Sequence, residues 1–308
     1  MNEIKKMNEI KKKKGFFYGR QGSHRKFIIL ALAFPTIHFL VFFVYKNFSS
    51  FVLPFQNNVG DWIGWDNFKW VFTSFKNNPY LDMSLALKNT LIFFAWGYVE
   101  LPIALILAYV FFKKMPGNKF FTIILYLPCI ISSTVMVAVF KNFIGSDGPI
   151  ALLWQLMGKQ WRYPVTQEGT SIPSMLAYDL WNGYGLTIIL YLAAMRRVPN
   201  ELFESAALDG VTMWQELIYI IVPLIWPMLG TKVILSVTGI FGASGPVLLF
   251  TNGEYGTMTV SFAMYLQYKE YGQIARASAI GMLFTVINLP LVFAARWLVG
   301  KVGDSYEY

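Results

Sequence analysis

Six long runs of apolar residues constrain the fold more than any other feature of the sequence. Three runs carry no charged residue, and the others carry one each: Glu100, Asp179 and Lys232. A helix of about 20 apolar residues crosses the ~30 Å hydrocarbon core of a bilayer, and it satisfies its own backbone groups there. The sequence therefore predicts an all-α, polytopic membrane protein with six transmembrane helices. The runs are Phe27–Tyr45, Asn89–Phe112, Phe120–Phe140, Pro173–Met195, Leu217–Phe250 and Ala277–Ala295.

Any single run could instead be a core helix of a soluble protein. Only 14% of the residues are charged, whereas about 25% are charged in an ordinary soluble domain. Six charge-poor runs and this composition together favour the membrane.

Lysines and arginines next to the ends of the runs orient the chain, because cytoplasmic connections carry an excess of them. Lys113 and Lys114 lie in the second connection, Arg196 and Arg197 in the fourth, and Lys301 follows the last run. The first and third connections are longer and richer in aromatic and amide residues, and they are expected to face outward. Both termini are therefore predicted to be cytoplasmic. The tail before the first run holds nine basic residues: Lys5, Lys6, Lys11, Lys12, Lys13, Lys14, Arg20, Arg25 and Lys26.

These assignments set the boundaries of the parts. Residues 1–26 form a basic cytoplasmic tail, 27–46 the first transmembrane helix and 47–84 an extracytoplasmic loop. Residues 85–299 form a membrane domain of five helices, and 300–308 a cytoplasmic C-terminal tail. The net charge of +9 comes mostly from the N-terminal tail, which is expected to touch anionic lipid. No nucleic-acid partner is expected, and the first run is too long for a cleavable signal peptide.

The sequence lacks the residue groups that most enzymes need. Cys129 is the only cysteine, so neither a disulfide within the chain nor a cysteine metal site is expected. The two histidines, His24 and His38, are too few for a usual zinc site. No phosphate-binding G-x-x-x-x-G-K-[ST] motif and no serine–histidine–acid arrangement occurs. We therefore expect no catalytic residue, no metal and no nucleotide bound by this chain itself.

The polar segment between the fourth and fifth runs has the signals of a helix, a break and a second helix. Asn200 is a favourable N-cap, and Glu204 lies in the early turns, where the helix dipole favours an acid. Gly210 is suited to a break after a helix end. Thr212 and Gln215 have the spacing of a capping box. The segment is therefore predicted to be a helical elbow at the cytoplasmic surface.

The first of these two helices carries a small apolar face. Leu202, Phe203, Ala206 and Ala207 fall on one side by helical spacing. Alanines at the centre allow close approach, which favours docking into a groove on another protein. The alternative is an amphipathic helix resting on lipid, but this helix is short and its acids outnumber its bases.

The same segment resembles the EAA loop of permease subunits of ATP-binding-cassette (ABC) importers. That pattern reads E-A-A, three residues, G, nine residues, then I-x-L-P. The chain gives Glu204-Ser205-Ala206, then Gly210, then Ile220-Ile221-Val222-Pro223, with serine and valine at two positions. The wider context VPNELFESAALDGVTMWQ is similar to the carbohydrate branch, of the maltose and glycerol-phosphate type. The resemblance covers residues 85–299 plus the preceding span, with the loop at 198–223.

This resemblance implies the transmembrane domain of a type I ABC importer in a bacterial inner membrane. The chain would form half of a pore that takes up a sugar or oligosaccharide. It implies as partners a second permease, two copies of an ABC ATPase that bind the ATP and magnesium, and an extracytoplasmic solute-binding protein. The loop would couple the pore to one ATPase through Glu204, Ser205, Ala206, Ala207, Asp209 and Gly210.

Polar residues inside the spans are candidates for the substrate path, because they are costly in lipid. The candidates are Asp179, Trp181, Asn182, Gly183, Tyr184, Lys232, Ser236 and Ser244. Aligned on Glu204, the resemblance to the maltose permease adds Gly239, Ile240 and Ala243 and supports Asn182, Gly183 and Ser236. The alternative is that glycines and serines serve helix packing and that aromatic residues anchor the interface.

Two questions about the charged residues stay open. Lys232 and Asp179 could recognise a charged sugar such as a uronate, or could form a structural ion pair with each other or with Glu100. The chain could also serve a non-sugar solute such as glycerol phosphate. An ion-coupled secondary transporter that uses these three residues is a further alternative, but it predicts inverted repeats, and the sequence has no convincing repeat.

Overall fold

The computed structural model describes residues 20–75 and 81–304, and helices dominate that part of the chain. In the described residues, extended segments pair only in one isolated bridge, between Gln56 and Trp62. The predicted all-α class is therefore confirmed. The predicted terminal tails, at 1–26 and 300–308, lie partly outside the described residues.

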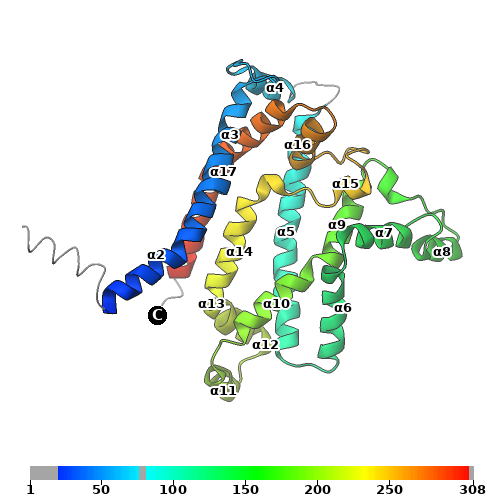
Figure 1. Cartoon of the computed structure of the whole chain (residues 1–308). Helices are drawn as coiled ribbons and strands as arrows, with labels where there is room; N and C mark the ends of the chain where they lie inside the picture. Colours follow the sequence, from blue (N-terminus) through cyan, green and yellow to red (C-terminus); the bar gives the residue numbers. More distant parts are fainter. Residues whose placement is uncertain (1–19, 76–80, 305–308) are drawn as a thin grey trace, which may run out of the picture.

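A long helical arm leads the described chain. It consists of α2 (Arg20–His38), the π-helical segment η1 (Phe39–Tyr45) and α3 (Lys46–Val52), followed by η2 (Leu53–Phe55). The arm runs beside α17 (Ile274–Asp304) (Figure 1). Its large apolar side chains are exposed, which suits a surface that faces lipid or another chain. The helix continues beyond residue 46, where the first transmembrane helix was predicted to end.

Helix α5 (Met83–Phe112) crosses the centre of the molecule (Figure 1). The Asp82 carboxylate caps its start by accepting a hydrogen bond from the Leu85 amide at 2.9 Å. The buried Asn89 donates its Nδ2 to the carbonyls of Gly256 and Met258, both at 2.8 Å. These bonds fix the upper part of α5 against the segment that precedes α16 (Val260–Lys269).

The third apolar run does not form one straight helix, contrary to the prediction. It divides into α6 (Asn118–Ile130) and α7 (Ser133–Phe143), which meet at an angle of 111°. Ile131 and Ser132 have extended backbone angles and end the first helix. Pro128 contributes because it offers no amide hydrogen to the turn before it.

The fourth and fifth runs are broken as well. The fourth divides into α9 (Ser171–Asn182) and α10 (Tyr184–Met195) at Gly183. The fifth bends by 73° before its main helix α14 (Trp226–Thr238), close to Pro223 and Pro227, and proline removes a backbone hydrogen bond from a helix. Its earlier part comprises α12 (Met213–Gln215), η4 (Glu216–Ile221) and α13 (Val222–Leu224). After Gly239 it continues only as η5 (Ile240–Gly242) and α15 (Val247–Phe250).

Three helices of the described chain are long and apolar enough to cross a membrane, and the number rises to five if each bent pair counts as one span. The three are Lys26–Phe55, Met83–Phe112 and Ile274–Gly303. The remaining predicted span is the fourth run, which is divided at Gly183, so the count of six stays a prediction.

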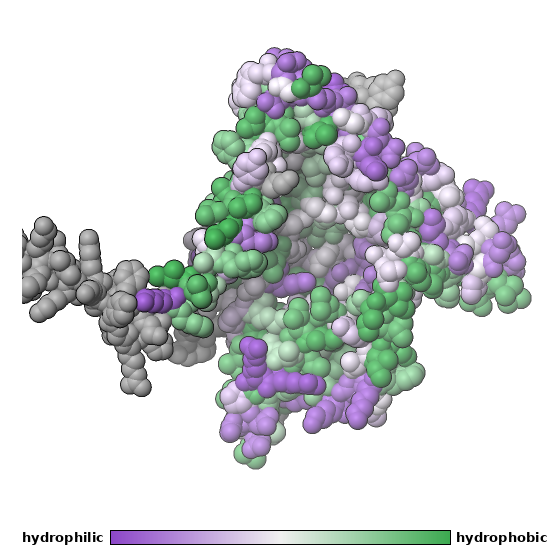
Figure 2. All heavy atoms as spheres, in the orientation of Figure 1, coloured by the Kyte–Doolittle hydropathy of each residue, from purple (hydrophilic) through white to green (hydrophobic). Residues whose placement is uncertain are grey.

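Packing and surface agree with this arrangement. The apolar core lies in three clusters, one of which joins α5, α10 and η4, while another joins α4 (Asp66–Thr73), α5, α16 and α17. The third joins α7, α9, α15 and α16, next to α8 (Pro149–Leu156) and η3 (Pro164–Thr166). Figure 2 shows polar side chains gathered at the two ends of the molecule and apolar ones along the body between them. The start of α2, the end of α17 and α11 (Asn200–Leu208) lie toward the same end (Figure 1).

Candidate translocation path and coupling loop

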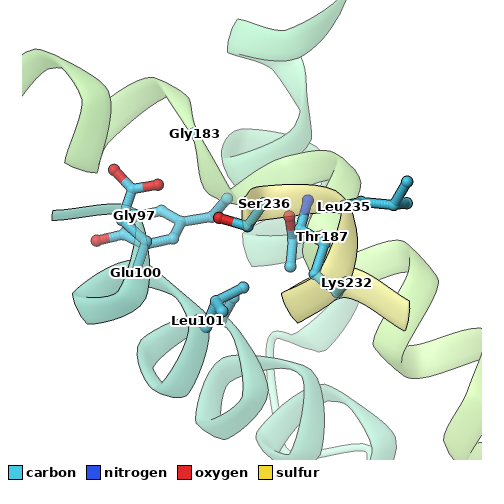
Figure 3. A pocket seen from close by; sticks show the side chains of 10 residues that line it. Gly97, Glu100, Leu101, Gly183, Thr187, Lys232, Leu235 and Ser236 are labelled. Carbon is cyan, nitrogen blue, oxygen red and sulfur yellow. The ribbon is translucent and has the colours of Figure 1, made fainter. Parts of the chain in front are cut away.

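A cavity of 320 Å³, here called the central cavity, lies among α5, the start of α10 and α14 (Figure 3). Four of the predicted path residues line it: Gly183, Tyr184, Lys232 and Ser236. Glu100 and Thr187 add two further polar side chains. Residues that are far apart in the sequence thus meet at a hydrogen-bonding, partly charged cavity between largely apolar helices.

Because Gly183 has no side chain, the carboxylate of Glu100 can lie close to the junction of α9 and α10. A Cβ atom added at Gly183 would lie 3.0 Å from Glu100 Oε2 and 2.7 Å from the carbonyl oxygen of Asp179. These distances leave no room for a side chain, so the glycine is required by space. Its backbone is not in the left-handed region, with φ at −79°.

Lys232 and Glu100 line the same cavity from α14 and α5, and Figure 3 shows them on two sides of it. The ion pairs within 4 Å in the described residues are Lys69–Asp66 and Lys113–Glu216. The structural ion pair that the sequence allowed, between Lys232 and Asp179 or Glu100, is therefore not formed here. The charged groups of the central cavity are left to face its interior.

A second cavity, of 450 Å³, lies nearer the end opposite α11 and is here called the outer cavity. Three predicted path residues line it: Asp179, Asn182 and Ser244. It is bounded by the end of α9, the first residue of α7, the segment before α15, and α16. The predicted residues are thus divided between two cavities that follow one another along α9 and α10.

The remaining path candidates line neither cavity. Trp181 lines an apolar hollow on α7 and stacks on Phe140, with ring centroids 5.9 Å apart. Ile240 is buried in the packing, and Gly239 ends α14. Ala243 packs against the cluster around α9 and α15. The structure therefore does not bring Trp181, Gly239, Ile240 and Ala243 to the cavities that hold the other candidates.

The helix breaks coincide with these cavities. Ser133 follows the bend between α6 and α7, Gly183 separates α9 from α10, and Ser244 follows the end of α14. Each of the three lines one of the two cavities. Irregular backbone at membrane depth is tolerated where it lies in protein or lines a watery cavity, and broken helices line the binding sites of many transporters. The breaks therefore favour a solute path.

The predicted elbow is present at the lower end of the molecule (Figure 1). Gly210 has φ of +71°, and the Thr212–Gln215 capping box forms with both of its bonds, so both predictions are confirmed. The N-cap prediction is wrong by one residue. Pro199, with extended backbone angles, takes the N-cap position, and Asn200 is the first helical residue.

The predicted apolar face of α11 is divided between two directions. Ala206 is only 5% exposed, and Phe203 is half-buried because it packs against the end of α5. The Phe203 and Phe112 rings lie 5.3 Å apart. Leu202 and Ala207 are exposed, and Leu208 is 89% exposed. The surface open to a partner therefore combines these apolar residues with the coupling candidates Glu204, Ser205, Asp209 and Gly210.

An ion pair that the sequence analysis missed anchors this elbow. Lys113 Nζ lies 2.6 Å from Glu216 Oε1 and 2.8 Å from Oε2, and Glu216 is only 8% exposed. The same ammonium lies 5.4 Å from the centroid of the Phe203 ring. Sequence analysis used Lys113 only to orient the chain. The available signal was a single acid at the start of an apolar run, where burial demands a partner.

Residues 100–304 match the family described as the binding-protein-dependent transport system inner membrane component. The chain belongs to this family. It is therefore a non-catalytic, multi-pass component of an inner-membrane transport system that works with a binding protein. The predicted class and the predicted absence of enzyme activity agree with the family.

Curated relatives cover most of the chain. The probable ABC transporter permease protein YesP of Bacillus subtilis is 27% identical over 85% of this chain and 84% of its own length. The arabinooligosaccharides transport system permease protein AraP of the same organism is 26% identical over 86% of each chain. A solved bacterial alginate ABC transporter, in complex with an alginate pentasaccharide-bound periplasmic protein, contains a similar chain. It has a TM-score of 0.78 and 25% identity, over 91% of this chain and 96% of that one.

Proposed function

We propose that this chain forms one half of the pore of an ATP-driven importer for an oligosaccharide that a solute-binding protein delivers. The observation that carries the proposal is the central cavity. It places Glu100, Tyr184, Lys232 and Ser236 at a helix break in the middle of a membrane protein of an importer family. Hydroxyl, carboxylate and ammonium groups beside an aromatic ring are the groups that hold sugars.

The other half of the pore would come from a second, related permease. The wall of the central cavity in this chain comes from α5, α10 and α14. Two ABC ATPase subunits would bind ATP and magnesium on the cytoplasmic side. Both termini of this chain, and α11, would face that side. The six apolar runs would then all contact the bilayer, including the run broken at Gly183.

Coupling would pass from the ATPase to the cavity through α5. An ATPase subunit would hold the exposed side of α11, and the Lys113–Glu216 pair joins that elbow to the lower end of α5. Twelve to thirteen residues earlier on α5, Glu100 and Leu101 line the central cavity. Closure of the ATPases would therefore shift a rigid helix that carries part of the cavity wall. Two packings in a nucleotide-dependent balance would give alternating access.

An oligosaccharide is favoured over other solutes by the relatives. The printed names of the similar proteins include arabino-oligosaccharides and alginate. Lys232 would accommodate a uronate carboxylate, since its ammonium has no carboxylate within 4 Å in the described residues. A non-sugar solute such as glycerol phosphate is the alternative. The family match disfavours an ion-coupled transporter.

Purification and uptake test the proposal together. We expect the chain to co-purify with a second permease and an ATPase. In proteoliposomes, it should accumulate labelled oligosaccharide only with ATP inside and binding protein outside. Transport by the chain alone, or without ATP, would contradict the proposal.

The charged cavity residue has its own prediction. In Lys232→Met, the ratio of galacturonate-oligosaccharide to arabino-oligosaccharide uptake should fall by about tenfold, which corresponds to one lost charge-assisted contact of ~1.5 kcal/mol. Lys269→Met, which changes an exposed lysine outside the cavity, serves as the control. An unchanged uptake ratio in Lys232→Met would rule out charge recognition by Lys232, but it would not contradict the import function.

A further inference from the structure

The outer cavity has the composition of a carbohydrate-binding site. Its volume of 450 Å³ exceeds the 320 Å³ of the central cavity. Aromatic rings and hydrogen-bonding groups line it together, as sugar rings require. The groups that matter here are Tyr178, Asp179, Asn182, Ser244, Phe262 and Tyr265.

Two polar atoms of this lining lack a hydrogen-bond partner in the described residues. They are the hydroxyl oxygen of Tyr178 and Oδ1 of Asn182, both buried. Tyr178 as a whole is only 2% exposed. Buried polar groups are nearly always paired, and each unpaired one requires an explanation. Neither atom reaches the cavity surface as the side chains stand, so a ligand hydroxyl group would supply the missing partner by drawing the side chain toward the cavity.

The outer cavity is separate from the central cavity but directly follows it. Among the described residues, none lines both. Asp179 and Asn182 lie in the last turn of α9, whereas Gly183 and Tyr184 begin the central cavity. One helical turn rises ~5.4 Å, which is comparable to the length of one sugar ring. Two neighbouring units of one chain could therefore occupy the two cavities.

We propose that the outer cavity binds a second sugar unit of an oligosaccharide whose leading unit occupies the central cavity. The ring of Tyr265 is partly exposed and is a platform for the face of that sugar, and Phe262 supports it from behind, with ring centroids 5.7 Å apart at 28°. Asp179 and Asn182 bind its hydroxyl groups, because carboxyl and amide oxygens accept hydrogen bonds from hydroxyl donors. The unit held there is thus a hydroxyl-bearing ring, and the pore selects chains of at least two units. This inference rests on the proposed import function.

Thiol labelling distinguishes the two cavities. The sole cysteine is removed by Cys129→Ser, and a new cysteine is placed in the outer cavity by Ser244→Cys or in the central cavity by Ser236→Cys. The assembled transporter is labelled with a small cationic methanethiosulfonate, in the presence of arabinose, arabinobiose or arabinotriose. The galacturonate series is run in parallel. We expect the monosaccharide to slow labelling only at position 236, and the longer sugars to slow it at both positions at least fivefold.

Each result decides something. Protection of 236 by the longer sugars with unchanged labelling of 244 would overturn the outer site and keep the import function. Equal protection of both positions by arabinose would also overturn it. If the cysteine of Ser244→Cys does not react even without sugar, the second permease covers the outer cavity, and the proposal is wrong. If no sugar protects 236, the import function itself fails, and the outer site with it.

Uptake kinetics give an independent readout. Tyr265→Ala removes the platform and should raise the KM for arabinotriose by about two- to tenfold, the effect of one lost aromatic contact. Tyr268→Ala is the matched control, because Tyr268 lies on the same helix but is exposed and outside the cavity. An equal change in both variants, or a change for arabinose as large as that for arabinotriose, would contradict the proposal. Co-purification of the ATPase with each variant verifies assembly.

Discussion

Gly183 lies where the two cavities, the break between α9 and α10 and the carboxylate of Glu100 meet. At this position one methyl group would contact both a side chain and a backbone carbonyl, and the carbonyl cannot move away cheaply. The absence of a side chain at Gly183 therefore determines whether the central cavity keeps its shape.

Gly183→Ala should lower uptake by tenfold or more. The added methyl forces α5 and α9 apart, and overpacking of this kind costs about 1–3 kcal/mol. The measurement is initial uptake in proteoliposomes together with the thermal unfolding temperature. Gly300→Ala is the control, since a Cβ there meets nothing within 4 Å. Equal behaviour of the two variants would show that space at Gly183 is not limiting.

The candidate path residues divide by where they lie in the structure, and their contact with a solute stays a prediction. Gly183, Tyr184, Lys232 and Ser236 were selected as polar or small residues in apolar runs, and they line one cavity. Ile240 was added by the alignment on Glu204, which carries no information that α14 ends at Gly239. Periodicity cannot locate such an end when no proline or charge marks it.

At the scale of elements, the Lys113–Glu216 pair joins the end of α5 to the start of η4 and supports α11 through the ring of Phe203. Removal of one partner would leave a mostly buried charge unpaired, which costs about 3–5 kcal/mol in a fully buried pair. Lys113 is partly exposed, so the lower end of that range applies.

Lys113→Met should separate ATP hydrolysis from uptake. The ATPase still binds α11, but the elbow no longer moves with α5, so uptake per ATP hydrolysed falls severalfold. The measurement is the ratio of the two rates on the same proteoliposomes. Lys114→Met, a neighbouring exposed lysine, should leave the ratio unchanged. The reversed pair K113E/E216K should recover part of the lost uptake per ATP. If none of these variants changes the ratio, the Lys113–Glu216 pair has no coupling role.

Element boundaries were predictable where the sequence carries local signals. The elbow at Gly210 and the capping box at Thr212 are examples, because backbone freedom and side-chain capping act within a few residues. The 111° bend between α6 and α7 was not predicted. Its direction depends on packing against α9 and α15, which lie far away in the sequence.

At the scale of the whole molecule, the elbow at α11, the continuous helix α5 and the two cavities follow one another from one end of the structure toward the other. The run lengths of the sequence predicted a multi-pass membrane protein, and the loop motif indicated the family. The division of the third, fourth and fifth runs was not visible in hydropathy, because broken and continuous helices have the same composition. The breaks are where the polar cavities form.

The central claim is that α11 couples an ATPase to a pore that binds sugar elsewhere. Gly210→Pro tests it most directly, because proline fixes φ near −65° whereas this position has +71°. The measurement is ATPase co-purification and ATP-driven uptake, together with oligosaccharide protection of Ser236→Cys in the same background. We predict that ATPase association and uptake are lost while sugar protection remains. Intact association and uptake in Gly210→Pro would contradict the coupling role of α11.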